Sequence, residues 1–219
     1  RELEVAVEDL GREFGVSWEN HKDLARYHAE LAPEVFNGYF KFSVVRNPWE
    51  RLLSDYNYQV RKSRPDASRL LLIDAEGRRR DFAAWTALAL GTADACEPNS
   101  WGGEVSAGIG RFSPQVDWIS LNGRIAVDFV ARLETIDLDF ERIRAATGLT
   151  QRRLPRRNAR FHLHYSWYYD EVTRARVARH YAADIAEFGY RFEESPLRRL
   201  WHGWRPATVS IGVEGRGNA

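Results

Sequence analysis

The stretch Phe40–Tyr56, FKFSVVRNPWERLLSDY, decides the fold of this chain. It begins as an apolar run and continues, after a short polar interruption, with a helical pattern. Val44 and Val45 favour a buried strand. Asn47 is a good helix N-cap, and Pro48 stands where proline is tolerated, at the first helical position. The stretch therefore predicts a strand, a tight turn and a helix.

The junction between strand and helix has the features of an anion site. The first amides of a helix are unpaired and its dipole favours negative charge. Arg46 stands at the carboxyl end of the strand, where α/β sheets bind ligands. Ser54 lies two turns beyond Asn47 and shares its stripe, so a guanidinium and a hydroxyl could converge on one phosphate. The alternative is an ordinary strand–helix unit with a surface arginine and a helical serine.

The motif VRNPWERLLSDY resembles the 3′-phosphate-binding motif of the sulfotransferases that use PAPS (3′-phosphoadenosine 5′-phosphosulfate), and it is most similar to their carbohydrate sulfotransferase branch. In that family an arginine after the strand and a serine in the helix hold the 3′-phosphate, which by position implies Arg46 and Ser54. The residues in register are Arg46, Asn47, Pro48, Arg51, Ser54 and Tyr56.

The resemblance implies a fold and a reaction. The fold is a nucleotide-kinase-like, P-loop-type α/β fold with three layers, in which a mostly parallel central sheet is flanked by helices. The reaction is sulfuryl transfer from PAPS to a hydroxyl of a carbohydrate or another hydroxylated acceptor, with release of PAP and without a metal.

Further site residues follow from the same resemblance. His21 matches the position of the proposed base toward the acceptor hydroxyl, and imidazole has a suitable pKa. His28 is the competing candidate inside a helix, and Glu19 is the next if neither histidine acts. Asn158 and Arg160 fall nearest to the residues that close over the nucleotide in the family.

The resemblance extends from about His21 to the terminal helix Tyr168–Tyr190, but no segment matches the family's phosphosulfate loop and its lysine. The chain opens at Arg1 and contains no methionine, so we expect that loop to be encoded upstream. Residues 1–195 are expected to form the sulfotransferase-like domain, and residues 196–219 a C-terminal tail.

Composition limits the other function classes. A length of 219 residues suits one domain, and a net charge of +1 provides no overall field for nucleic acid. One cysteine, Cys96, fits a reducing compartment, so a bacterial cytoplasm is favoured over the Golgi lumen. No apolar run reaches transmembrane length. The oligomeric state is left open.

Pattern and turn signals predict the remaining elements. A metal site is disfavoured at His162 and His164, although strand spacing would place both imidazoles on one face. The predicted elements are a helix ending near Leu31, a short helix from Pro33, a helix from Pro48 to about Ser63, a helix capped by Asp81 and stopped by Gly91, a hairpin turn at Asn122-Gly123, a strand Ile125–Arg132, a helix Asp137–Thr147, and a long helix capped by Asp170 and ended by Gly189.

Two other functions are compatible with these patterns. The first is a P-loop kinase for a nucleoside or sugar, which the absence of a metal-binding carboxylate after a strand disfavours. The second is a non-catalytic protein of the same fold that binds PAP or anionic glycans. Binding of PAP rather than ATP would separate the sulfotransferase from the kinase, and an upstream phosphosulfate loop would eliminate the non-catalytic protein.

Overall fold

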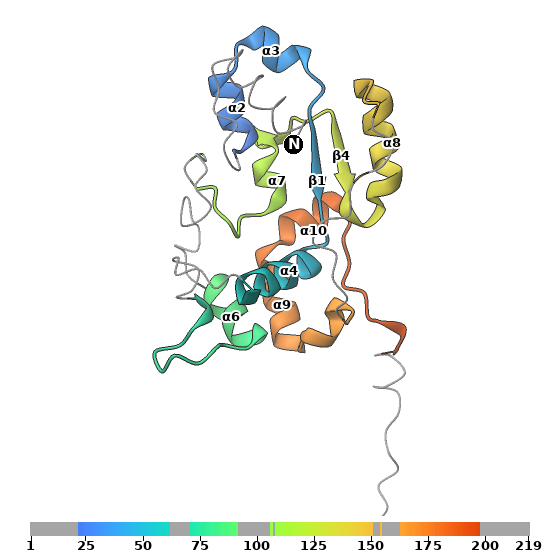
Figure 1. The fold of residues 1–219 in the computed structure, drawn as a ribbon. Coiled ribbons are helices and arrows are strands. Elements are labelled where there is room, and N and C mark those ends of the chain that lie inside the picture. The colour runs from blue at the N-terminus through green and yellow to red at the C-terminus, as the bar shows by residue number, and fades with distance from the viewer. Residues whose placement is uncertain are drawn as a thin grey trace, which may run out of the picture.

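The computed structural model describes residues 22–61, 71–91, 106, 108–150, 154 and 163–197. Its centre is a parallel pair of strands, β1 (Phe42–Val45) and β4 (Phe129–Arg132), which lie side by side in Figure 1. The parallel pairing agrees with the predicted α/β class. Among the described residues this sheet has two strands, so the three-layer, nucleotide-kinase-like arrangement stays a prediction.

The strand, turn and helix predicted from the opening stretch are confirmed. Helix α4 (Pro48–Arg61) begins directly after Asn47, whose side-chain Oδ1 accepts a hydrogen bond from the backbone N of Trp49 at 3.1 Å. Proline at the first helical position has no N–H to leave unpaired. The helix is thus fixed at its start by the cap that the sequence indicated.

The prediction of a fully buried strand at β1 is wrong for one of its faces. Val45 is 1% exposed and packs on Ile119, whereas Phe42 is 45% exposed and Val44 43% exposed. Alternate strand residues point to opposite faces, so only the face that carries Val45 is covered.

The single strand predicted at Ile125–Arg132 is divided in two. The Asn122-Gly123 turn joins β2 (Ser120–Leu121) to β3 (Arg124–Ile125) as an antiparallel hairpin, as expected from two residues that adopt positive φ. The chain then changes partner, because the backbone N of Asp128 donates to the Lys41 carbonyl at 2.8 Å. Residues 126–128 carry the chain from the hairpin to β1.

The long helix predicted near the C-terminus is also divided. Its cap Asp170 and its end at Gly189, which has φ 66°, are confirmed, but the helix breaks at Tyr181 into α9 (Glu171–His180) and α10 (Ala182–Phe188). Helix α9 packs against α4, and α10 packs against the helix before the hairpin. The break lets the two halves bury different faces.

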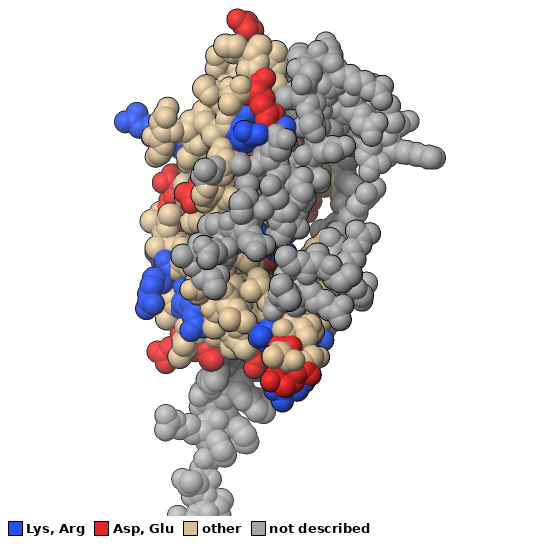
Figure 2. All heavy atoms as spheres, turned by 90° about the vertical axis from the view of Figure 1, so that its left-hand side faces the viewer, with Lys and Arg blue, Asp and Glu red and all other residues tan. Residues whose placement is uncertain are grey.

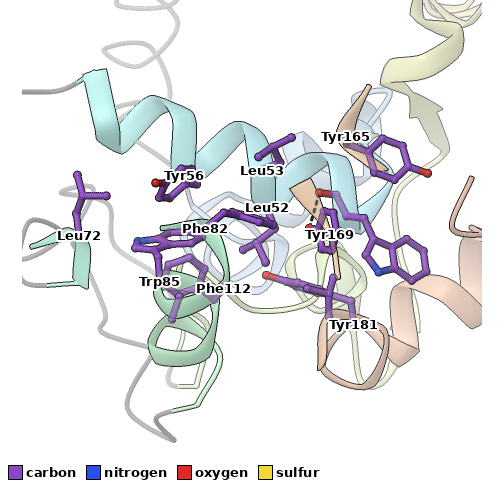
Figure 3. Packing of buried hydrophobic residues seen from close by; sticks show 13 residues of the cluster. Leu52, Leu53, Tyr56, Leu72, Phe82, Trp85, Phe112, Tyr165, Tyr169 and Tyr181 are labelled. Carbon is purple, nitrogen blue, oxygen red and sulfur yellow. Dashed lines mark hydrogen bonds between the residues drawn. The ribbon is translucent and has the colours of Figure 1, made fainter. Parts of the chain in front are cut away.

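The largest core cluster lies around α4, as Figure 3 shows. Leu52 and Leu53 are at most 1% exposed, and Tyr56 packs edge-on against Phe82 with ring centroids 5.5 Å apart. The Tyr169 hydroxyl donates to the Trp49 carbonyl at 2.8 Å, so α4 is joined to the segment before α9 by packing and by a buried hydrogen bond. Burial of a leucine side chain such as Leu52 or Leu53 stabilises the fold by about 1.5–3 kcal/mol.

The remaining helices surround these elements (Figure 1). Those predicted from Pro33, after Asp81 and before Gly148 form close to the expected residues. No helix within the described parts of the chain has the length and apolarity needed to cross a bilayer. In chain order they are α2 (Leu24–Glu30), α3 (Pro33–Gly38), α6 (Phe82–Ala89), α7 (Gln115–Trp118), the 3-10 helix η2 (Leu133–Thr135), α8 (Ile136–Thr147) and the 3-10 helix η3 (Tyr165–Tyr168).

The strand spacing of His162 and His164 does not correspond to a strand at His164, the described residue of the two. His164 is the N-cap of η3, where its ring accepts from the backbone N of Ser166, and His162 lies outside the described residues. A side chain that caps a helix is not arranged along a strand face.

We predict that Asp170→Ala destabilises the protein by about 1 kcal/mol, the usual cost of losing an N-cap. The Asp170 carboxylate accepts a 2.6 Å hydrogen bond from the backbone N of Thr173, and this bond lowers the pKa of Asp170. The stabilisation is therefore present at neutral pH and is lost as pH falls through the lowered pKa. Urea unfolding at several pH values measures it.

Asp170→Asn is the matched control, since asparagine caps helices about as well and does not titrate. The control should stay close to the unaltered protein at pH 7. If Asp170→Ala and Asp170→Asn are equally destabilised there, the cap does not hold α9.

Candidate active site

Arg46 follows β1 and is held by one amide side chain. Its backbone N donates to Gln115 Oε1 at 2.9 Å, and its carbonyl accepts from Gln115 Nε2 at 2.8 Å. Gln115 is the first residue of α7 and reproduces the bonding of a neighbouring strand. The backbone of Arg46 is thereby fixed beyond the end of the strand pair.

Gln115 is itself oriented by a buried carboxylate. Asp184 of α10 is 0% exposed, and its Oδ2 accepts from the backbone N of Gln115 at 2.9 Å and from Gln115 Nε2 at 3.2 Å. Its Oδ1 accepts from the backbone N of Val116 at 2.9 Å. Burial, and then the charge of Asp184, raise the pKa of the nearby Asp117. A chain of hydrogen bonds thus runs from α10 through α7 to Arg46.

The guanidinium of Arg46 is only partly satisfied. Its Nη2 donates to Glu50 Oε1 at 2.9 Å, one turn along α4, while its Nε is buried and has no hydrogen-bond partner. A buried donor without an acceptor costs about 1–3 kcal/mol. An anion with several oxygens, arriving in place of Glu50, is a group that would satisfy this arginine.

Ser54 lies in the second turn of α4 and is half-buried. Its side-chain hydroxyl makes no hydrogen bond to any residue that the structure describes. At about 1.5 Å per residue, Ser54 stands roughly 9 Å along the helix from Pro48. Its hydroxyl is available for a ligand, and its convergence with Arg46 on one phosphate stays a prediction.

The start of α4 is less open to an anion than the sequence suggested. Its cap Asn47 already accepts from the Trp49 amide, and the Asn47 backbone N donates to Glu134 Oε1 at 2.5 Å. Glu134 follows β4, so the carboxyl ends of the two strands are joined by this contact. An anion bound here must therefore rest more on side chains than on these two amides.

Glu134 also faces Tyr190. The Tyr190 hydroxyl donates to Glu134 Oε2 at 3.3 Å, and the pKa of Tyr190 is raised well above its usual range by burial and by the Glu134 charge. The Arg132 guanidinium lies over the Tyr190 ring, 5.2 Å from its centroid. Tyr190 is therefore a neutral donor that orients Glu134 rather than an acid or base for chemistry near pH 7.

The second arginine of the motif has a structural role. Arg51 Nη1 donates to the Ser113 carbonyl at 3.2 Å and Nη2 to the Arg111 carbonyl at 3.1 Å. Arg111 in turn pairs with Asp55 on the next turn of α4. These contacts hold the segment that leads into Gln115.

The other predicted site residues are not brought together by the described structure. His21, Asn158 and Arg160 lie outside the described residues. His28 is exposed on α2, and its ring packs edge-on against Phe36 with centroids 4.8 Å apart. This ring contact gives His28 a packing role on α2.

Sequence reasoning missed Gln115, Asp184 and Glu134 as supports of the site. Gln115 lies 69 residues from Arg46 and Glu134 lies 87 residues from Asn47, so no local spacing connects them with the motif. The available signal for Asp184 was its place in the terminal helix, three residues from Tyr181 and seven from Val177, on the side that the apolar residues define. A carboxylate on that side needs buried partners.

The surface carries no strong overall charge. On the face shown in Figure 2, described basic and acidic side chains are interspersed rather than gathered by sign. Nowhere in the described ranges do three His, Cys, Asp or Glu side chains gather closely enough to hold a metal ion.

The mixed α/β fold is compatible with the result of a comparison against protein families. A model of the sulfotransferase family matches residues 10–191, which is most of the chain and includes Arg46, Ser54 and their supports. The chain therefore belongs to the sulfotransferase family, and it is a transferase of sulfuryl groups by that membership. A search of curated proteins gave no match, and a search of solved structures gave none either.

We predict that Asp184→Ala costs about 3 kcal/mol of stability, because it removes the acceptor of three partly buried N–H groups of Gln115 and Val116. Glu187→Ala is the matched control, since Glu187 is an exposed carboxylate on the same helix and should change stability by less than about 0.5 kcal/mol. Urea unfolding compares the two. Equal losses would mean that Asp184 does not hold α7 and Arg46.

Proposed function

We propose that this chain transfers a sulfuryl group from PAPS to a hydroxyl of a carbohydrate or another hydroxylated acceptor, and releases PAP. The observation that carries the proposal is Arg46, an arginine that follows a parallel strand in a chain of the sulfotransferase family and has a buried donor without a partner. Such an arginine suits a phosphate because its donors match two oxygens.

In this proposal Arg46 and Ser54 hold the 3′-phosphate of the nucleotide. Arg46 exchanges its contact with Glu50 for one with the phosphate, and the hydroxyl of Ser54 donates a second hydrogen bond. The amide clamp of Gln115 on the Arg46 backbone keeps the guanidinium at the strand end. Asn158 and Arg160 close over the nucleotide.

The transfer itself needs positioning and a base. The acceptor oxygen attacks sulfur, the bond between sulfur and the bridging phosphate oxygen breaks, and PAP leaves. The acceptor's hydroxyl proton passes to His21. Carbohydrate is favoured as acceptor because the motif is most similar to that branch of the family.

We predict that PAP binds more tightly than adenosine 5′-phosphate and that Arg46→Ala removes most of the difference. A charge-assisted hydrogen bond contributes about 1.5–3 kcal/mol, so PAP affinity should fall roughly tenfold to a hundredfold. Adenosine 5′-phosphate, which lacks the 3′-phosphate, should change little. Titration calorimetry on the full-length protein measures both nucleotides.

Arg78→Ala is the control for Arg46→Ala, because Arg78 pairs with Asp74 on the surface, where its side chain is 75% exposed. That variant should bind PAP normally. Equal affinity of PAP and adenosine 5′-phosphate, or an Arg46→Ala variant that binds PAP unchanged, would contradict the assignment.

We predict that His21→Ala lowers the turnover rate by about 10²–10⁴, the usual contribution of general acid–base catalysis, and leaves PAP affinity nearly unchanged. The matched control is His28→Ala, which should affect stability more than turnover because His28 packs on Phe36. Transfer from labelled PAPS to a panel of hydroxylated glycans and small molecules provides the assay. Normal turnover by His21→Ala with loss in His28→Ala would reverse the two roles.

A further inference from the structure

A cavity lies at the amino end of β1. It has a volume of about 380 Å³ and is lined by residues of α2, α3, β1 and the end of α7, and its two strand residues are Phe42 and Ser43. Ser43 precedes Arg46 by three residues, or roughly 10 Å along a strand. In open α/β sheets the nucleotide lies beyond the carboxyl ends of the strands. The cavity at the amino end of β1 is therefore separate from the proposed nucleotide site.

Most of the described lining residues are apolar, and six of them are aromatic. Phe36 of α3 is buried, whereas Tyr39 is 56% exposed and Phe42 is 45% exposed. Trp118 lines the same cavity from α7, and its indole Nε1 is buried without a hydrogen-bond partner. Aromatic walls with a few polar groups are characteristic of sites for small molecules, and the volume lies within the range of such sites.

Two lysines at the cavity are already neutralised. Lys22 Nζ pairs with Glu30 at 2.5 Å, and the Lys22 side chain is 3% exposed. Lys41 Nζ donates to the carbonyls of Phe36 and Tyr39 at 3.1 and 3.0 Å and pairs with Asp128 at 3.1 Å. These contacts use the ammonium groups, so a negative charge on the ligand would gain little here. The cavity favours an uncharged ligand.

We propose that this cavity binds a neutral, mainly apolar small molecule with a planar ring system and an oxygen acceptor for donors such as the Ser43 hydroxyl. The ring stacks among Phe36, Tyr39 and Trp118, and its burial supplies the affinity. The site is distinct from the one proposed for PAP, so ligand binding does not depend on that assignment.

The test uses N-phenylnaphthylamine, a neutral two-ring dye whose fluorescence rises in apolar sites. It should bind the full-length protein with a stoichiometry of one, and Ser43→Phe, which fills the cavity, should weaken binding at least tenfold. Val44→Phe is the matched control, because Val44 is the next strand residue and faces the opposite side. Absence of binding, or equal binding by the two variants, overturns the proposal.

A second variant and a charged dye complete the test. Tyr39→Ala alters only an exposed wall residue, so it should fold and weaken the dye several-fold even if Ser43→Phe does not fold. Anilinonaphthalene sulfonate carries the same rings with a negative charge and should bind no more tightly than the neutral dye. Tenfold tighter binding of the sulfonate would make this an anion site and overturn the proposal. A protein dimer in gel filtration that Tyr39→Ala dissociates would assign the surface to a second copy, with the same consequence.

Discussion

The hydrogen bonds of the buried Asp184 carboxylate are the constraint on which the rest of the site depends. A carboxylate with no exposure must be satisfied by donors, and here the donors are two backbone amides at the start of α7 and the Gln115 side chain. Gln115 then binds both backbone groups of Arg46. The position of the phosphate-binding candidate is therefore supported by a residue more than 130 positions away in sequence, through the hydrogen bonds from Gln115 to Asp184 and between Gln115 and Arg46.

At the carboxyl end of the strand pair, carboxylates of the protein occupy hydrogen-bond donors that an anionic ligand would also use. Glu50 pairs with the Arg46 guanidinium, and Glu134 accepts from the Asn47 backbone, so two carboxylates stand where an anionic ligand is proposed. The buried Arg46 Nε without a partner shows that this internal arrangement is incomplete. A ligand phosphate offers more acceptor oxygens than Glu50 alone, which is the physical reason for expecting exchange. The two ends of β1 differ in the ligand that they favour. The cavity at the amino end contains lysines that are already paired, and its walls include aromatic side chains.

Three sequence-based predictions were only partly correct, because each depended on how distant elements pack together. The hydrophobic run at β1 indicated a strand but not that Phe42 and Val44 would stay exposed, because exposure depends on which elements cover the sheet. The apolar run Ile125–Arg132 has one pattern but two partners, the hairpin and β1, and the pattern does not encode the change. The continuous helical periodicity through Tyr181 likewise does not reveal the break, which follows from packing α9 and α10 against different neighbours.

The sequence by itself determined the local elements and named the candidate residues of the site. Asn47-Pro48 starts α4, Asp170 and Gly189 bound the terminal helices, Asn122-Gly123 makes the hairpin, and Arg46 and Ser54 identify the motif, because caps, turns and motifs depend on residues close together in the chain. Only the tertiary structure decided which groups support Arg46. Gln115, Asp184 and Glu134 reach it across long sequence separations, and a polar residue's partner is fixed by the packing that brings distant elements together.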